Sequence, residues 1–330
     1  MTVQITIIGL GQIGASVGLA LAAHRDKVTT IGHDKDFSVE QRARKLGAVD
    51  VVNHNLPSAV EKADVVILAL PVDQIRDTFG YIAQDLKKDA VVIDTAPVKA
   101  EVEKWAADLL PKTVHYVGLV PSIAAEYLDL TGTGLDSAKA DLFSKSIFLL
   151  SAPSGTPGEA VKLASDLVDL MGASVMLTDF VESDGLMASV NLLPRLTAAA
   201  LLNTTMDQPG WQEARKAASL AYFRATAAFS ASENASAVTM LARHNKENVV
   251  RLLNQIIISL VDLRDDLEEN EDAFKTRLES AQRGRDNWLL ERSKADWLQV
   301  SGGNVEKVSL LESLLGSKLG KMGKRSNNGE

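Results

Sequence analysis

The chain has 330 residues, a formal net charge of −8, five histidines and no cysteine. This length allows two domains with sizeable hydrophobic cores. The absence of cysteine excludes disulfides, thiolate catalysis and cysteine-based metal sites, and scattered histidines without a His-x-x-x-His spacing predict no metal site. The acidic balance argues against nucleic acid as the main partner.

The N-terminal sequence and the distribution of apolar residues bear on location. Met1-Thr2-Val3 leads directly into an apolar strand pattern without a signal peptide. No segment has the unbroken apolar length of a membrane span. We therefore expect a cytoplasmic protein with no membrane partner.

The first predicted strand and the turn after it carry the strongest local signal. An apolar run over residues 3–8 ends in a Gly-x-Gly-x-x-Gly pattern and passes into a helical pattern. In a dinucleotide-binding unit the first glycine permits the turn, the second lets the backbone approach the pyrophosphate, and the third lets the helix pack on the strand. We therefore predict a pyrophosphate cradle made of Gly9, Gly11, Gln12, Ile13 and Gly14.

An acidic residue lies where ribose recognition requires one. A second apolar segment ends at His33-Asp34, 20 residues after Gly14. Asp34 would accept the adenosine ribose hydroxyls and repel a 2′-phosphate, which favours NAD over NADP. Lys35 tempers this preference because a cation there can pair with a phosphate, so NADP stays the alternative. An ordinary strand–helix turn with a solvated Asp34 is the other interpretation of these residues.

Apolar segments alternate with helical patterns through the first part of the chain, which predicts a Rossmann-type parallel, doubly wound α/β sheet. The six expected strands are Val3–Ile8, Lys27–Ile31, Ala48–Val52, Asp64–Leu70, Ala90–Asp94 and Thr113–Val117. Two further strands are expected at Lys145–Ser151 and Ala173–Leu177, around a helix over Gly158–Met171. Ligands of such sheets bind at the carboxyl ends of strands, which makes Leu70, Pro71 and Asp94 candidate cofactor residues. For Asp94 a structural role is the alternative.

The pattern changes after Asp179, and nearly everything to about Ser280 is helical. The apolar helix expected over Asn248–Leu267 needs more cover than one polar face allows, so it belongs to a core, to a dimer interface or to both. We predict a dinucleotide-binding domain over residues 1–178, an all-helical substrate and dimerisation domain over residues 179–300, and a tail over residues 301–330 whose last part is disordered.

An ordered set of short segments matches one known family. Besides the glycine loop, the matching residues are 68–72 (Leu-Ala-Leu-Pro-Val), Asp94 with Val98-Lys99, Pro121 with Glu126, Asp184 with Leu193-Pro194, Phe223-Arg224, and Asn245-Lys246-Glu247. Over roughly Gln4 to Arg292 the chain resembles the prephenate and arogenate dehydrogenases of tyrosine biosynthesis. The resemblance implies oxidation of a small anionic substrate by hydride transfer to the nicotinamide, in a protein whose helical domain builds a homodimer.

The reactive positions of that family carry other residue types in this chain. The family's catalytic Ser, His and Arg positions are occupied by Ala96 or Pro97, Val120, Ser183, Leu192, Arg195 and Ala228. Loss of a positioned general acid or base costs about 10²–10⁴ in rate. The departures therefore leave open a second interpretation, a catalytically retired or repurposed NAD-binding protein with a sensing or assembly role.

Four candidates remain for the substrate chemistry, and they are Arg195, Arg224, Asp184 and Glu126. The two arginines can hold carboxylates bidentately, but arginine cannot act as a base. The resemblance places Asp184 and Glu126 at the cleft, where they are the acid–base candidates. A helix cap for Asp184 and a solvated loop acid for Glu126 are the alternatives. Arg195 lies in an apolar helix and requires an anionic ligand or an internal acid such as Asp184.

Overall fold

The computed structural model describes residues 2–130, 132–229 and 235–295, and the expected tail 301–330 lies outside this part. The chain divides into two compact units. Of the described residues, the first unit contains 2–96, 102–130, 132–180 and 289–295, and the second contains Pro97–Glu101, 181–229 and 235–288. The short segment Pro97–Glu101 thus belongs with the later helices, although it follows a strand of the first unit.

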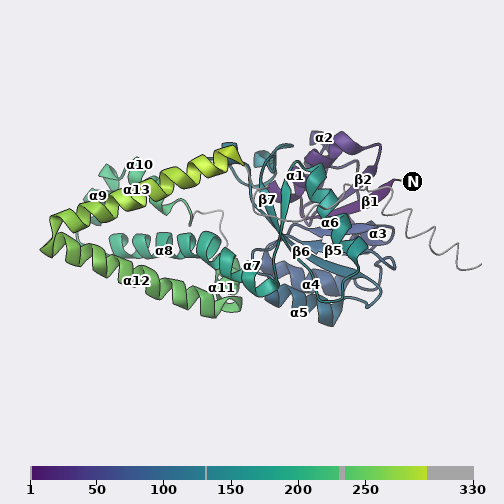
Figure 1. Ribbon diagram of the computed structural model, residues 1–330. Helices are drawn as coiled ribbons and strands as arrows, with labels where there is room; N and C mark the ends of the chain where they lie inside the picture. Colours follow the sequence, from purple (N-terminus) through teal and green to yellow (C-terminus); the bar gives the residue numbers. More distant parts are fainter. Residues whose placement is uncertain (1, 131, 230–234, 296–330) are drawn as a thin grey trace, which may run out of the picture. The chain divides into compact units, whose positions relative to one another are not determined.

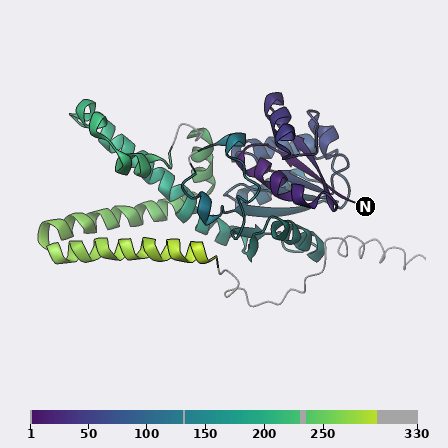
Figure 2. The ribbon, with the colours of Figure 1, turned by 90° about the horizontal axis from the view of Figure 1, so that it is seen from above.

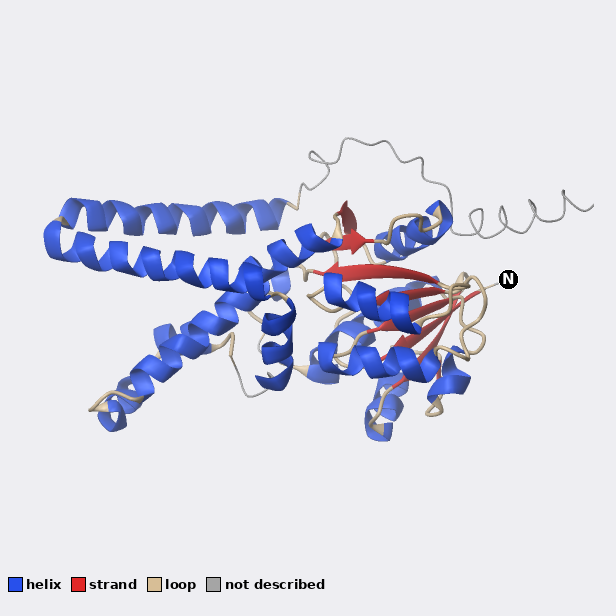
Figure 3. Cartoon of the chain, turned by 90° about the horizontal axis from the view of Figure 1, so that it is seen from below, coloured by secondary structure: helices blue, strands red, loops and turns tan. Residues whose placement is uncertain are grey.

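One eight-stranded sheet forms the centre of the first unit (Figure 3). Its strands are β1 (Val3–Ile8), β2 (Val28–His33), β3 (Val51–Val52), β4 (Val65–Leu68), β5 (Val91–Asp94), β6 (His115–Pro121), β7 (Ile147–Ser151) and β8 (Ser174–Leu177). They lie in the order β3-β2-β1-β4-β5-β6-β7-β8, and among the described strands only β6 and β7 pair antiparallel. The order reverses between β1 and β4, which is the switch point where doubly wound sheets bind ligands. The predicted Rossmann-type fold is confirmed.

Helices cover both faces of the sheet (Figure 1). The connecting helices are α1 (Gln12–Leu21), α2 (Phe37–Leu46), α3 (Leu56–Val60), α4 (Val72–Ile82), α5 (Ala100–Leu109) and α6 (Gly158–Leu170), with short 3-10 helices η1 (Ala22–His24), η2 (Ala125–Tyr127) and η3 (Gly134–Ser137). One core cluster joins Val17 of α1, Ala43 of α2 and Leu163 of α6 to the sheet. Because α4 and α5 cover the other face, all four residues of β4 are buried, and its sequence is a continuous apolar run rather than an alternating one.

The described residues of the second unit are helical or loop. They form α7 (Phe180–Met187), a π-helical turn η4 (Ala188–Leu192), α8 (Leu193–Met206), α9 (Trp211–Ala217), α10 (Leu220–Thr226), α11 (Ala235–His244), α12 (Lys246–Glu269) and α13 (Glu271–Lys294). Figure 2 shows α12 and α13 as a helical hairpin. Close to its turn, Arg277 Nε lies 2.7 Å from an Asp266 carboxylate oxygen. The predicted helical region after the sheet is confirmed.

The helix Phe180–Met206, made of α7, η4 and α8, corrects the expectation about membrane spans. It is long and apolar enough to cross a membrane by length and composition alone, with a mean hydropathy of 1.4 over its most apolar window. The expectation from the sequence considered only unbroken runs of apolar residues. The mean hydropathy of a segment can be high even when polar residues interrupt the run. One such helix is weak support for membrane insertion, because the core helix of a soluble protein passes the same test.

Candidate nucleotide-binding site

The turn between β1 and α1 holds three glycines in three different environments. Gly9 has a φ of +89°, and a Cβ there would lie 2.5 Å from the Ala69 carbonyl oxygen. A Cβ on Gly14 would lie 1.9 Å from the Gly9 carbonyl oxygen, whereas a Cβ on Gly11 would meet no protein atom within 4 Å. The packing of the protein itself therefore requires glycine at residues 9 and 14. Glycine at residue 11 instead leaves space free for a ligand.

A pocket of about 340 Å³ opens beside this turn. Of the residues that the sequence singles out for the cofactor, those that line it are Gly9, Gly11, Asp34, Leu70 and Pro71. The other residues that line it are Ile8, His33, Lys35, Leu56, Ala69, Gln74 and Thr78. Apart from Leu56, which starts α3, the lining comes from the ends of β1, β2 and β4 and the segments that follow them, as the switch-point rule requires.

Helix α1 begins at this pocket without a capping side chain. Its N-cap residue is Gly11, and its first turn carries no acidic residue. The first N–H groups of a helix lack partners within the helix, and the helix dipole places partial positive charge there. The Gly11 end of the pocket is therefore suited to a phosphate group.

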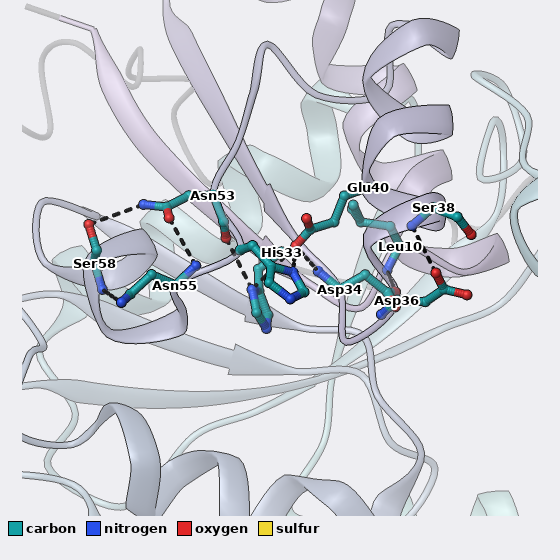
Figure 4. Close-up of polar contacts among 10 residues, drawn as sticks. Leu10, His33, Asp34, Asp36, Ser38, Glu40, Asn53, Asn55 and Ser58 are labelled. Carbon is teal, nitrogen blue, oxygen red and sulfur yellow. Dashed lines mark hydrogen bonds and ion pairs between the residues drawn. The ribbon is translucent and has the colours of Figure 1, made fainter.

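Asp34 connects the end of β2 to the glycine loop (Figure 4). The N–H of Leu10 donates to Asp34 Oδ2 at 2.8 Å, and the N–H of Asp36 donates to Oδ1 at 3.0 Å. A carboxylate oxygen can accept more than one hydrogen bond, so both oxygens keep capacity for ribose hydroxyls. The carboxylate is thus held in a fixed position at the wall of the pocket.

Some pocket residues were missed from the sequence, among them Gln74 and Thr78. They lie four residues apart in α4, the helix that starts directly after Pro71. Residues four apart share one face of a helix. The four-residue spacing of Gln74 and Thr78, just after the end of β4, is the sequence signal that could have identified them as pocket residues.

Asp94 is enclosed by protein and does not line the pocket. Its side chain is 0% exposed, Oδ1 accepts the N–H of Ala96 at 2.9 Å, and Oδ2 accepts the hydroxyl hydrogen of Tyr116 at 2.6 Å. The carboxylate holds the loop after β5 and one aromatic side chain of β6. We therefore assign Asp94 the structural role that the sequence left open, in place of the expected cofactor contact.

Gln12, Ile13 and Gly14 lie in the first turn of α1 and do not line the pocket. Gly14 acts through packing, since its Cα faces the Gly9 carbonyl. The three residues remain candidates only for backbone contacts to a phosphate at the helix start.

Asp184, in the second unit, caps a helix other than its own. The residue is 4% exposed. Its carboxylate accepts hydrogen bonds from the backbone N–H groups of Lys99 and Ala100 at the start of α5. The side chain of Asn245 donates to the Asp184 carbonyl oxygen at 2.6 Å. The sequence alternative for Asp184 was a cap on the helix that begins near it. The structure shows a cap formed at long range instead.

The remaining candidates lie in different places. Arg195 follows the π-helical turn η4, and its Nη1 donates to the backbone oxygen of Asn191 at 2.8 Å and to the Asn191 side-chain oxygen. Such turns occur frequently at functional sites. Arg224 is exposed in α10, and Glu126 is exposed in η2 of the first unit. Neither unit by itself therefore brings all four predicted catalytic residues together.

Residues 17–177 match the family model described as the nucleotide-binding domain of prephenate dehydrogenase. The chain is 34% identical over 202 residues to a cyclohexadienyl dehydrogenase of Zymomonas mobilis, covering 60% of this chain and 66% of that protein, slightly less than two thirds. It is 26% identical over 268 residues to a prephenate dehydrogenase of Bacillus subtilis, covering 81% of this chain and 71% of that protein.

Solved structures of similar fold carry related names. A prephenate dehydrogenase from A. aeolicus in complex with hydroxyphenyl propionate and NAD+ matches with a TM-score of 0.74 at 22% identity, covering 87% of this chain and 98% of that chain. An arogenate dehydrogenase from Synechocystis matches with a TM-score of 0.68 at 22% identity, covering 86% and 99%. At these identities the likeness concerns the fold. Together, the family model, the two relatives and the fold show that the chain is similar to the prephenate and arogenate dehydrogenases, and that its nucleotide-binding domain matches theirs.

Proposed function

We propose that the chain is an NAD-dependent dehydrogenase of the prephenate/arogenate type that oxidises a small anionic substrate. The observation that carries the proposal is the pocket, with open space at Gly11, an uncapped α1 and the fixed Asp34 carboxylate. When bound, NAD supplies the hydride acceptor. The residues of this chain bind and orient it: the start of α1 faces the pyrophosphate and Asp34 accepts the ribose hydroxyls.

The choice of NAD over NADP rests on charge at the wall of the pocket. The Asp34 carboxylate would lie beside a 2′-phosphate and repel it. Lys35 lines the same pocket and could pair with that phosphate. NADP therefore stays the alternative cofactor.

The substrate side of the proposal rests on three residues of the helical unit, Arg195, Arg224 and Asp184, and on Glu126 of the first unit. Arg195 and Arg224 can form forked hydrogen bonds to a carboxylate. Asp184 and Glu126 remain the candidates for proton transfer. For Asp184 this role requires that its carboxylate also serve the two N–H groups at the start of α5. Glu126 is exposed and carries no such duty in the described part of the chain.

A second candidate function is an NAD-binding protein without turnover, with a sensing or assembly role. It is favoured by the side chains at the positions where the family has Ser and His. Ala96 is 2% exposed and Val120 is 4% exposed, so both are packed into the protein rather than offered to a ligand. Pro97, the alternative residue for the Ser position, is partly exposed and has no hydroxyl group. The carboxylates of Asp94, two residues before Ala96, and of Asp184 are engaged by backbone N–H groups.

We also propose that the chain forms a homodimer through its helical unit. Helix α12 exposes Ile257, Ile258 and Leu260 at 56%, 60% and 59%. Contiguous exposed apolar side chains of this size mark interaction surfaces. Light scattering at micromolar concentration tests the dimer, and a monomer would contradict it. A cytoplasmic location without nucleic-acid or membrane partners stays a prediction from the sequence.

The first experiment measures NADH formation with NAD and prephenate, and separately with arogenate, together with the NAD dissociation constant of the same preparation. The comparison variants are Arg195→Met and Arg283→Met. Removal of a charged partner from a substrate carboxylate costs about 2–5 kcal/mol, or about 30-fold to several thousandfold in kcat/KM. Arg283 is the control because it pairs with Glu279 on exposed α13.

The outcomes separate the two functions. Turnover that falls in Arg195→Met but not in Arg283→Met, with NAD affinity unchanged in both, supports the dehydrogenase. NAD binding without turnover on either substrate supports the second function. Failure of the folded chain to bind NAD would contradict both.

A further inference from the structure

Three potential metal ligands from three different segments meet next to Asp34 (Figure 4). His33 ends β2, Glu40 lies in α2, and His54 lies in the loop between β3 and α3. Glu40 Oε1 lies 3.5 Å from His33 Nδ1 and 3.1 Å from His54 Nδ1. One ligand atom from each residue lies within 4.8 Å of the others.

Glu40 has a buried carboxylate that the described protein does not fully satisfy. Its side chain is 0% exposed, and Oε1 accepts the N–H of Asp34 at 3.0 Å. Oε2 is buried and has no hydrogen-bond partner among the described residues. An unsatisfied buried polar group costs about 1–3 kcal/mol, and more when it is charged. The cluster therefore has a place for a cation beside the Glu40 carboxylate.

We propose that His33, Glu40 and His54 bind a divalent transition-metal ion, with Zn²⁺ as the best match. Two imidazoles, one carboxylate and a water in the fourth position form a ligand set that Zn²⁺ takes in proteins. Mg²⁺ and Ca²⁺ prefer sets made of oxygen ligands alone. Bonds of about 2.0–2.1 Å in a tetrahedral site separate the ligand atoms by about 3.3 Å.

The geometry requires only small adjustments to close around such an ion. The separations of 3.1 and 3.5 Å from Glu40 Oε1 bracket the tetrahedral value. The His54 side chain is 54% exposed, so its ring is free to turn and water can reach the fourth position. His33 Nδ1 also lies 3.1 Å from the Asn53 carbonyl oxygen, to which it can donate a proton. Metal binding through Nδ1 would require the other neutral tautomer of His33, with its proton on Nε2.

The site would connect β2, α2 and the β3–α3 loop at the wall of the nucleotide pocket. Glu40 holds the Asp34 backbone through one hydrogen bond, and Asp34 in turn holds Leu10 of the glycine loop. An ion on Glu40 would therefore stabilise this end of the first unit with or without a nucleotide. The proposal is independent of the dehydrogenase function.

The test uses the full chain, stripped of metal with a chelator and titrated with Co²⁺, whose visible spectrum reports its coordination. We expect one Co²⁺ per chain with the absorption of a four-coordinate ion, displacement by Zn²⁺, and a higher Tm with either metal in the absence of nucleotide. His54→Gln removes one of the three ligands. Loss of a residue that only hydrogen-bonds to a metal ligand weakens metal binding by about 10–100-fold, so loss of a ligand should weaken Co²⁺ binding by at least this factor.

His24→Gln is the matched control. His24 lies in η1 of the same unit and makes no ion pair among the described residues, so this variant should bind Co²⁺ as the unaltered chain does. Glu40→Gln keeps an oxygen acceptor for the Asp34 N–H but removes the charge, and should also abolish binding. If its circular dichroism shows that it is unfolded, His54→Gln carries the test.

Three results would overturn the proposal. They are failure of the folded chain to bind Co²⁺, binding without a four-coordinate spectrum, and equal affinity in His54→Gln. In each case His33, Glu40 and His54 do not form the four-coordinate metal site proposed here.

Discussion

Alanine at Gly11 and at Gly14 adds the same methyl group in opposite situations. Gly11 has φ −73° and ψ −161°, which alanine adopts, and the new Cβ would meet no atom within 4 Å. Lower entropy of the unfolded chain favours Gly11→Ala by about 0.4–1 kcal/mol. The preference for glycine over alanine at the N-cap position of α1 offsets this gain, so the stability of Gly11→Ala should stay close to that of the unaltered chain. At Gly14 the Cβ would lie 1.9 Å from the Gly9 carbonyl oxygen. Helix α1 must shift, and overpacking of this kind costs about 1–3 kcal/mol or more.

Nucleotide affinity should respond differently from stability. The methyl group of Gly11→Ala would occupy the space through which a pyrophosphate approaches the start of α1. We expect NAD binding at least about tenfold weaker, which is at least about 1.4 kcal/mol. Gly80→Ala is the control, because Gly80 is exposed in α4 with no atom within 4 Å of a Cβ. It should gain stability and keep its NAD affinity.

Urea unfolding without nucleotide measures the stability of the three variants, and calorimetric titration measures their NAD affinity. The expected order of stability places Gly80→Ala above the unaltered chain, Gly11→Ala close to it and Gly14→Ala well below it. A Gly11→Ala variant as unstable as Gly14→Ala would refute the open space at residue 11. A stable Gly11→Ala variant with undiminished NAD affinity would refute the placement of the pyrophosphate.

Three other residues give predictions that depend on the hydrogen bonds of their side chains. The hydrogen bond to Asp141 raises the pKa of Tyr127 to about 12, so Asp141→Asn should bring the ionisation of that tyrosine back toward about 10 in an ultraviolet titration. For Asp50, burial raises the pKa, but the hydrogen bonds from Thr30 and an arginine outweigh it and the net pKa is lowered. Its stabilising effect is therefore present above the unfolded pKa of about 3.9 and is lost as the pH falls through the lower folded pKa. Urea unfolding should show Asp50→Asn as destabilised at neutral pH, with the difference disappearing in strong acid. Asp184→Ala should lower stability by about 0.5–2 kcal/mol through loss of the cap on α5, and unchanged stability with lost turnover would instead indicate a catalytic role.

Features that depend on neighbours along the chain could be predicted from the sequence. The glycine loop is one of them, because the residues that shape the turn lie within six positions of each other. The strands of the sheet are another, because burial on both faces leaves a continuous apolar run that a single segment reveals. The end of β6 was missed: the strand continues to Pro121, because the antiparallel partner β7 pairs with it there. A partner that arrives from a later segment leaves no local mark.

The roles of Asp94 and Asp184 depended on such distant partners. The Asp184 carboxylate accepts N–H groups 84 and 85 positions away. The Asp94 carboxylate accepts the hydroxyl hydrogen of Tyr116, 22 positions away. In both cases the sequence identified an acid at the end of an element, but the donors that decide its role come from elsewhere in the fold. Residue type and position alone could not separate a structural carboxylate from a reactive one.

The cluster of His33, Glu40 and His54 was also missed, although the information to find it was present. The His-x-x-x-His spacing identifies metal ligands that lie on one helix. These three residues were missed because they lie on successive segments of the chain. In a β–α–β–α path with right-handed crossovers, the carboxyl end of each strand and the start of the next helix lie at the same edge of the sheet. His33 ends β2, Glu40 is in the first turn of α2, and His54 follows β3 by two residues. Because these three positions share one edge of the sheet, a comparison of potential ligands at the ends of neighbouring strands groups them together from the sequence alone.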